Sequence, residues 1–410
     1  MKKYFSFLLI AAAACLMLAA CSPAKNESPT SANTPTESAN TNAQETTQEQ
    51  AQGAVPEQSQ AQEQEQGAVP EQSQEQPQTA QHTPERQALP ASSEYVAIDA
   101  ASLKNNIINE PLEKEIWVYL PQDYEAGDKR YPVLYFLPGY SENLSSYSDK
   151  LAELMTALIS GGDCSEIIVV GVPGKNKFGG SFYVNSPITG NWEDFVTIDV
   201  IDYIDENYRT IAKAESRGLV GFSMGGFGAW NLAMLHPEIF GCAYAMSPGV
   251  FDAGNVGAAS NIEPGDRTFT RMSDEEAIEE YEYIISGNRA DFTLAYGSAF
   301  AYNMDARPPY IDYVTKDTPE MVSKWDSGYG NVVEKVAQYS GNLKQLKAFA
   351  IDYGTRDFYA WIPDGCRFLS EQLTAAGIEH VLLDYDGGHG DKFFERFETA
   401  VIPFFMENLA

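Results

Sequence analysis

The stretch Leu219–Gly226, which reads LVGFSMGG, constrains the fold of this chain more than any other. It starts as an apolar run, turns through glycines and continues into a helix-like run over 227–235. A strand, a glycine turn and a helix in this order form the setting in which G-x-S-x-G lifts a serine hydroxyl above a sheet. Glycines on both sides of the serine permit the tight turn. We therefore expect Ser223 to be a nucleophile, with the Met224 N–H facing incoming negative charge.

Strand-like and helix-like runs alternate through the C-terminal part of the chain. The predicted strands are Glu115–Leu120, Pro132–Leu137, Ile167–Val172, Gly218–Phe222, Cys242–Met246, Leu346–Asp352 and His380–Tyr385. The predicted helices are Ser145–Ile159, Trp192–Tyr208, Met224–His236, Ala360–Ala376 and Lys392–Asn408. This alternation predicts an α/β fold, in which a mainly parallel, twisted sheet carries helices on both faces.

Residues 251–340 interrupt that alternation. They are rich in Tyr, Asp, Gly and Pro, and one helical segment is expected around Asp274–Ser286. Because strand signals resume after them, we interpret this region as an insertion beside the sheet within a single domain, 93–410.

The N-terminus has the pattern of an export signal. Two lysines precede an apolar run that is short for a membrane span, and 1–20 is expected to be a signal peptide. The run ends in Leu-Ala-Ala-Cys, which resembles the bacterial lipobox, so Cys21 is the expected lipidation site. The alternative is an ordinary signal peptide followed by a chance cysteine. The lipobox reading predicts an exported lipoprotein, anchored by acyl chains to the bacterial cell surface rather than spanning the membrane.

Residues 21–92 are predicted to be a disordered linker. They consist mainly of Gln, Glu, Pro, Ser, Thr, Ala and Asn, and the segment 52–60 is repeated at 66–74. Such a composition buries too little apolar surface to offset the entropy of ordering the chain. The expected role is a tether that holds the folded domain away from the membrane.

The net charge and the cysteine content limit which ligands, metals and disulfides the chain is expected to have. A formal net charge of −31 disfavours nucleic acid and fits neutral substrates. The sequence has no Cys/His cluster with metal-ligand spacing, and we expect neither a metal nor a cofactor. After Cys21, three cysteines remain, Cys164, Cys242 and Cys366. One disulfide and one free thiol would be compatible with export, but the sequence does not select the pair.

A serine nucleophile needs a base and an acid that orients it, in the chain order Ser, Asp or Glu, His for this kind of sheet. His389 lies in a glycine loop between the last predicted strand and the last helix, where it can reach Ser223. The remaining histidines fit less well: His82 lies in the linker, His236 ends the helix after Ser223, and His380 opens a strand.

The expected acid is Asp357, which follows the strand before the one that leads to His389. It lies at the carboxyl end of a strand, the edge at which ligands bind in such sheets. The rival carboxylates are Asp352, Asp384 and Asp386, which lie in or close to strands; the alternative for Asp357 is a helix cap. The loop Leu137–Ser141 offers the Tyr140 N–H as a second oxyanion donor beside Met224.

Several further segments together resemble one known family. They are Tyr119–Pro121, Leu137–Gly139, Gly180–Ser186, Asp205–Arg209, Gly221–Gly226, Asp352–Asp357 and Gly387–His389. Over nearly all of 95–410 the chain resembles the esterase family of the α/β-hydrolase superfamily that includes feruloyl and acetyl-xylan esterases, S-formylglutathione hydrolases and mycolyltransferases. The resemblance implies an α/β-hydrolase fold, a triad of Ser223, Asp357 and His389, and an oxyanion hole from Tyr140 and Met224. Many relatives have His-Gly where this chain has Pro138-Gly139.

By the same resemblance, the expected function is a serine esterase that removes feruloyl or acetyl groups from plant cell-wall polysaccharide through an acyl-enzyme. The alternatives are an acyltransferase of the mycolyltransferase type and a non-catalytic, carbohydrate-binding surface lipoprotein. Aromatic residues stack on rings and sugars, and Tyr183, Trp192 and Phe300 are the candidates for substrate contact.

Overall fold

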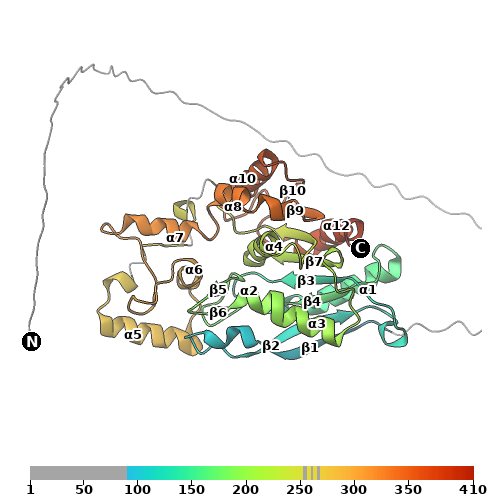
Figure 1. Ribbon diagram of the computed structural model, residues 1–410, viewed down its shortest axis with the longest axis horizontal. Helices are drawn as coiled ribbons and strands as arrows, with labels where there is room; N and C mark the ends of the chain where they lie inside the picture. Colours follow the sequence, from blue (N-terminus) through green and yellow to red (C-terminus); the bar gives the residue numbers. More distant parts are fainter. Residues whose placement is uncertain (1–89, 253–255, 260–261, 266–267) are drawn as a thin grey trace, which may run out of the picture. The chain divides into compact units, whose positions relative to one another are not determined.

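The structure, a computed structural model, describes residues 90–252, 256–259, 262–265 and 268–410 (Figure 1). The predicted signal peptide 1–20, Cys21 and the predicted linker up to residue 89 lie outside the described residues. The first strand, β1, already begins at Ser92, the last residue assigned to the linker. This strand was not predicted, because its polar first residues continue the composition of the preceding segment.

The core of the domain is an eight-stranded sheet in the order β1-β2-β4-β3-β7-β8-β9-β10. Its strands are β1 (Ser92–Asp99), β2 (Glu113–Leu120), β3 (Val133–Leu137), β4 (Ile168–Gly171), β7 (Arg217–Phe222), β8 (Cys242–Met246), β9 (Ala348–Gly354) and β10 (Val381–Tyr385). The pairs β1–β2 and β2–β4 are antiparallel and the other neighbours are parallel. Every predicted strand has its counterpart here, and the mainly parallel sheet is confirmed. A separate two-stranded sheet joins β5 (Asn185–Ser186) to β6 (Gly190–Asn191).

Helices cover both faces of the sheet (Figure 1). The α-helices of the described residues are α1 (Ser148–Gly161), α2 (Trp192–Asp194), α3 (Ile201–Asn207), α4 (Met224–Leu235), α5 (Asp274–Tyr283), α6 (Phe292–Phe300), α7 (Val322–Asp326), α8 (Val332–Gln338), α9 (Ser340–Leu343), α10 (Trp361–Ala375), α11 (Phe393–Arg396) and α12 (Ile402–Asn408). The α1, α11 and α12 helices pack on one face, and α3, α4 and α10 pack on the other. The predicted covering of both faces is confirmed.

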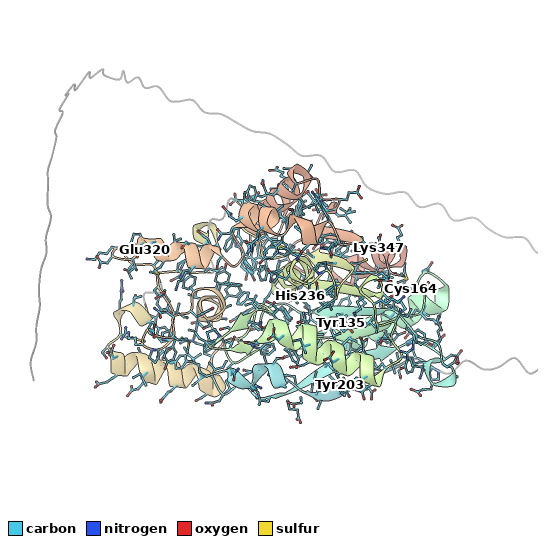
Figure 2. All side chains as sticks on the ribbon, viewed as in Figure 1. Tyr135, Cys164, Tyr203, His236, Glu320 and Lys347 are labelled. Atoms are coloured by element: carbon cyan, nitrogen blue, oxygen red, sulfur yellow. The ribbon has the colours of Figure 1, made fainter. Side chains whose placement is uncertain are left out.

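Strand β3 shows why both faces are apolar. Alternate side chains of a strand point to opposite faces. Accordingly, Tyr135 and Leu137 join the core on the α4 side, whereas Leu134 and Phe136 join the core on the α1 side. Figure 2 shows Tyr135 within the dense layer of side chains between the elements. A strand buried on both faces reads as a continuous apolar run, as β3 does.

The region 251–340 holds more helix than predicted. The prediction of one helical segment is wrong, because α6, α7 and α8 lie there together with α5. The α5 helix was recognisable from its polar surface, and its Ser273–Glu276 capping box fixes its start. The α6 helix has apolar residues all round and is largely buried, so it lacks the periodicity that marks a surface helix.

The three cysteines of the described residues are buried and free, so no disulfide joins them. Cys164 packs against the sulfur of Met406 at 3.5 Å, Cys242 lies in β8 and Cys366 in α10. None of the helices in the described residues is long and apolar enough to cross a membrane.

Candidate active site

Ser223 sits at a sharp turn between β7 and α4. Its backbone has φ 56° and ψ −113°, a sparsely populated conformation that the surroundings must enforce. Glycines make the turn possible: a Cβ at Gly221 would lie 1.9 Å from the Gly225 carbonyl oxygen, and one at Gly225 would lie 1.9 Å from the Leu137 carbonyl oxygen. The Ser223 N–H donates to the Met246 carbonyl oxygen at 2.9 Å, which ties the turn to the neighbouring strand.

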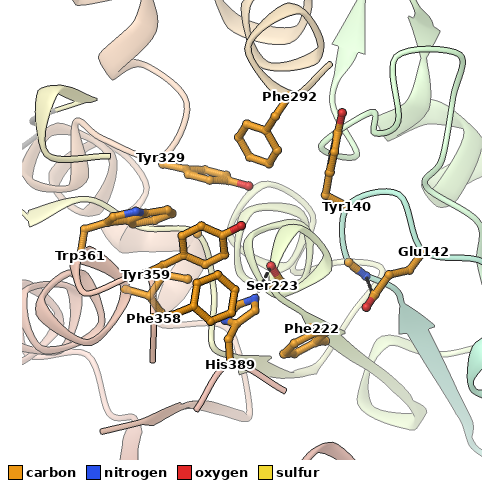
Figure 3. A pocket seen from close by; sticks show the side chains of 13 residues that line it. Tyr140, Glu142, Phe222, Ser223, Phe292, Tyr329, Phe358, Tyr359, Trp361 and His389 are labelled. Atoms are coloured by element: carbon orange, nitrogen blue, oxygen red, sulfur yellow. Dashed lines mark hydrogen bonds between the residues drawn. The ribbon is translucent and has the colours of Figure 1, made fainter. Parts of the chain in front are cut away.

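Parallel strands bring the other two predicted residues to the same edge. His389 Nε2 lies 3.0 Å from Ser223 Oγ, and His389 Nδ1 lies 2.7 Å from Asp357 Oδ2 (Figure 3). A carboxylate only accepts hydrogen bonds, so Nδ1 carries the proton and Nε2 is left to accept from the serine hydroxyl. The Asp357 side chain is fully buried and that of His389 is 10% exposed. Ser223 and His389, which are 166 positions apart in the sequence, are thus joined with Asp357 in one row of hydrogen bonds.

The Asp357 carboxylate is held on its second oxygen as well. Oδ1 accepts the Tyr359 N–H at 2.8 Å, which fixes the carboxylate plane toward His389. The imidazole in turn packs among the rings of Phe222, Phe358 and Tyr359, with centroids 4.9, 5.5 and 5.3 Å away. Burial, followed by the nearby Asp357 charge, raises the pKa of Tyr359, so this phenol stays neutral beside the pair.

The rival acids have other partners or positions. Asp352 is buried in β9, where its Oδ2 accepts from Arg396 Nε at 3.1 Å and from the Tyr244 hydroxyl at 3.0 Å. Asp386 forms an exposed ion pair with Arg356 at 2.8 Å, and Asp384 is exposed on β10.

The remaining histidines of the described residues also lie apart from Ser223. His236 at the end of α4 contacts Glu193 at 2.9 Å, and His380 contacts the Ser370 hydroxyl at 2.6 Å. His82 lies outside the described residues.

The loop after β3, which holds Tyr140, passes beside Ser223. Strand register sets Leu137 opposite Gly221, and a Cβ at Gly139 would lie 3.4 Å from the Ser223 Cβ. The Gly139 N–H donates to Glu142 Oε2 at 2.6 Å, whereas the Tyr140 N–H has no acceptor among the described residues. Met224 is the first residue of α4, so its N–H has no partner within the helix. Of the two predicted oxyanion donors, Tyr140 thus lies in the loop after β3, and Met224 lies at the N-terminus of α4, directly after Ser223.

Side chains around the loop lock it in place. The Tyr183 hydroxyl donates to the Pro138 carbonyl oxygen at 2.9 Å, and the Tyr140 hydroxyl donates to the Phe178 carbonyl oxygen at 2.6 Å. The Tyr147 hydroxyl donates to Glu142 Oε2, the atom that also accepts from Gly139. Burial, followed by the Glu142 charge, raises the pKa of Tyr147. These contacts hold the Pro138–Glu142 loop in one conformation beside Ser223.

A cavity opens above Ser223 and His389, and its lining is mostly aromatic. Besides these two it is lined by Gly139, Tyr140, Glu142, Phe222, Gly249, Phe292, Tyr329, Phe358, Tyr359, Trp361 and Ile362. Figure 3 shows the rings of Phe292, Tyr329, Tyr359 and Trp361 grouped on one side of Ser223, with Glu142 on the other. The lining is suited to a flat apolar group, which aromatic rings contact at their faces and edges.

The predicted substrate-contact residues are not in this lining. Tyr183 and Trp192 are fully buried, Tyr183 under the Pro138 loop and Trp192 in the core with its Nε1 donating to the Thr189 carbonyl oxygen at 2.9 Å. Phe300 packs against Phe182 and Tyr296 behind the cavity. These three predictions are corrected, because the residue type alone does not distinguish a core aromatic from one that faces a ligand.

The residues that do line the cavity carried little signal in the sequence. Phe358 and Tyr359 directly follow Asp357, and this adjacency would have found them. Phe292 and Tyr329 come from the inserted region, and only the three-dimensional fold brings them to the site. No group of His, Cys, Asp and Glu that could hold a metal ion occurs among the described residues.

Comparisons with known proteins agree with this architecture. The family model described as "Putative esterase" matches residues 111–400. An endo-1,4-beta-xylanase/feruloyl esterase of Xylanibacter ruminicola is 32% identical over 143 residues, which are 33% of this chain and 19% of that protein. An esterase of Mycobacterium tuberculosis is 31% identical over 137 residues, 32% of this chain and 28% of that protein. The chain thus spans less than a third of the length of these two relatives.

Among solved structures, a ferulic acid esterase superposes with a TM-score of 0.53 at 19% identity, covering 78% of this chain and 100% of that one. At this identity the similarity shows the fold alone, which is the predicted α/β-hydrolase fold.

Proposed function

The chain belongs to the esterase family whose model matches residues 111–400, and from this premise we propose that it is a serine carboxylic-ester hydrolase. The observation that carries the proposal is the hydrogen-bonded chain from Ser223 through His389 to Asp357, at the floor of a cavity open to a ligand. Each member has the partner that nucleophilic catalysis requires: a base for the hydroxyl and a carboxylate for the base.

In the first half of the proposed cycle, His389 Nε2 takes the proton of Ser223 Oγ as the oxygen attacks the ester carbonyl. The negative charge that develops on the carbonyl oxygen is stabilised by the N–H groups of Met224 and Tyr140, with the N-terminus of α4 adding its dipole. Preorganised donors of this kind are worth about 3 kcal/mol each in the transition state.

In the second half, His389 gives its proton to the departing alcohol, and an acyl group remains on Ser223. Water then attacks the acyl-enzyme with His389 again as base, which releases the acid and restores the serine. Asp357 keeps the Nδ1 proton in place and stabilises the imidazolium that forms twice in each cycle.

We further propose that the acyl group is feruloyl or acetyl, released from plant cell-wall polysaccharide or its oligosaccharides. The aromatic lining favours a planar aryl acyl group, which can stack on Trp361 or Tyr329. The match to a protein named endo-1,4-beta-xylanase/feruloyl esterase supports the same choice. A net charge of −31 also favours neutral esters over polyanionic substrates.

A panel of methyl ferulate, acetylated xylan and p-nitrophenyl acetate tests the proposal. We expect the wild-type chain to hydrolyse at least one of them and Ser223→Ala to lose this activity with an unchanged fold by circular dichroism. Near-full activity of Ser223→Ala would overturn the mechanism. Failure of the folded wild type to hydrolyse any ester would overturn the esterase assignment and favour a carbohydrate-binding protein.

The sequence of the N-terminus supports a second proposal, on localisation: an exported protein that carries lipid on Cys21. Growth of a bacterial host with labelled palmitate is expected to label the wild-type chain but not Cys21→Ser. Equal labelling of both, or of neither, would contradict lipidation at this residue.

A further inference from the structure

A second cavity adjoins the catalytic one. Glu142 lines both, so the two spaces meet at this side chain. The second cavity, here called the side groove, has a volume of about 760 Å³, within the range of sites that hold small organic ligands. Residues with polar or aromatic side chains line it, among them Tyr95, Glu113, Glu115, Glu142, Asn143 and Lys175.

The strand directions place the side groove at the catalytic edge of the sheet. Because β2 runs antiparallel to β4, its first residue, Glu113, lies at the edge where the parallel strands end. Lys175 follows the end of β4, and Asn143 lies in the loop between β3 and α1. Ser223 and Glu142 lie at this same edge, so the groove continues the catalytic cavity rather than opening elsewhere.

The groove offers the groups that bind hydroxyls. Tyr95 is 44% exposed, and its hydroxyl is anchored by donating to Ser148 Oγ at 2.8 Å. Lys175 Nζ donates to Asn143 Oδ1 at 3.3 Å, which holds an ammonium and an amide side by side. The exposed carboxylates of Glu113 and Glu115 form no ion pair within the described residues. An exposed ring beside donors and acceptors suits a sugar, whose faces are apolar and whose edges carry hydroxyls.

The charge of the groove selects among hydroxyl-rich ligands. Glu113, Glu115 and Glu142 contribute three carboxylates. Of the two lysines in the lining, Lys114 is paired with Glu110, outside the lining, which leaves Lys175 as the balancing cation. An anionic ligand would meet repulsion here, whereas a neutral one would not.

We propose that the side groove binds the alcohol half of the ester, and that this alcohol is a neutral oligosaccharide. The inference rests on the proposed esterase function. An ester has two halves on either side of its carbonyl, and in Figure 3 the rings of Tyr329 and Trp361 lie on the other side of Ser223 from Glu142. With the acyl group among the rings, the alcohol extends past Glu142 into the groove.

Kinetics on two esters with the same acyl group test the assignment. Tyr95→Ala is expected to raise KM for a feruloylated arabinoxylo-oligosaccharide about 3- to 10-fold, the loss of one ring contact. It should leave kcat/KM for methyl ferulate within about twofold. Tyr283→Ala is the matched control, since Tyr283 is 52% exposed and lines neither cavity. Equal effects on both esters, or no effect on the oligosaccharide ester, would overturn the proposal.

Binding without hydrolysis separates this inference from the proposed function. Calorimetry of Ser223→Ala with unesterified arabinoxylo-oligosaccharide is expected to show binding that Tyr95→Ala, added to it, weakens about 3- to 10-fold. Absence of binding, or equal binding in both variants, would overturn the groove assignment whatever the wild type hydrolyses. If the oligosaccharide bound as expected but the wild type hydrolysed no ester, only the proposed function would be overturned.

A charged ligand tests the selection by charge. An oligosaccharide bearing glucuronic acid is expected to bind several-fold more weakly than the neutral one at low salt. The double variant Glu113→Gln/Glu115→Gln should narrow this gap, because it removes two of the carboxylates. Tighter binding of the acidic oligosaccharide to the unmodified groove would contradict a neutral alcohol.

Discussion

The active site combines two sets of residues of different origin. One set follows closely on parallel strands and consists of Ser223, Asp357 and His389. The other set reaches the same cavity from helices and loops outside the sheet and consists of Phe292, Tyr329 and Trp361. The first set, the sheet edge, is held by backbone geometry and hydrogen bonds of 2.7 to 3.0 Å. The second set, the aromatic wall, is held by ring packing, as between Tyr329 and Phe227 at 5.0 Å.

This difference separates two roles. Hydrogen bonds with fixed directions place reacting atoms, and a small displacement there costs orders of magnitude in rate. Ring packing fills a space, and a change of one ring alters which acyl group fits by a smaller factor. We therefore expect changes at the sheet edge to lower kcat for every ester, and changes in the aromatic wall to raise KM for bulky aromatic esters only.

The largest effect is expected at the buried acid of the sheet edge. Asp357→Asn should lower kcat about 10⁴-fold for methyl ferulate and p-nitrophenyl acetate alike, because an amide no longer holds the His389 tautomer. Steady-state kinetics on both esters measure this. A loss confined to the aromatic ester would contradict this division of roles, since Asp357 would then act in binding the acyl group, as the aromatic wall does.

Asp352, in the preceding strand β9, provides the contrasting carboxylate. Asp352→Asn removes the charge that Arg396 faces in the interior and should lower the free energy of unfolding by about 3 kcal/mol. The folded fraction should keep its kcat within a few-fold, because Asp352 does not contact His389. Urea denaturation and kinetics at 25 °C measure the two quantities. A drop in kcat as large as that of Asp357→Asn would show that the two carboxylates act together.

An intermediate effect is expected in the aromatic wall. Phe292→Ala should raise KM for methyl ferulate about 10-fold and leave p-nitrophenyl acetate unaffected, since the small acyl group does not reach the ring. Phe300→Ala is the matched control, because it lies on the same helix, α6, outside the lining. If both variants changed KM equally, packing of α6 rather than contact with the acyl group would explain the result.

The smallest effect is expected at His236, which lies at the C-terminal end of α4, whereas Ser223 lies at its N-terminal end. A hydrogen bond to Glu193, opposed by burial and aided by the charges of Glu193 and Glu238, raises the pKa of His236. The resulting stability is complete below the unfolded pKa, about 6.5, and is lost as pH rises through the higher folded pKa.

His236→Gln should therefore reduce the fall in stability between pH 6 and pH 8. The change should stay below about 1 kcal/mol, since the ion pair is partly exposed. Urea denaturation of both proteins at the two pH values measures it. A steeper fall in the variant, or a change in kcat, would contradict the assignment of His236 to stability alone.

The same division explains what the sequence could predict. Strand periodicity and chain order sufficed for Ser223, Asp357 and His389 because each is tied to the end of one strand, and the structure brings the three together. Glycine spacing located the turn because a side chain at Gly221 or Gly225 would overlap the backbone. The sequence thus predicts those parts of the site whose positions depend on local backbone geometry, namely the ends of the strands and the glycine turn.

The aromatic wall was not predicted, because its residues reach the cavity through contacts between segments that are distant in the sequence. Tyr183 and Tyr329 are both buried tyrosines, yet only Tyr329 touches the cavity, and this depends on packing between distant segments. The β1 strand escaped prediction because its apolar run, 95–98, is short and follows polar residues, and because it pairs at the sheet edge, where of its residues only Ile98 is buried. Tertiary contacts, rather than local pattern, determine both.

The burial of the three free cysteines in the described residues allows ligand entry to be followed with a fluorescent label. Burial raises the pKa of Cys164 to about 12 and that of Cys242 to about 11, and raises that of Cys366 as well. Maleimides react with thiolates, so these side chains should stay unlabelled in the native state. Phe358, 70% exposed at the cavity mouth, could then be replaced by a reactive cysteine, and a fluorophore there would respond as an acyl group enters.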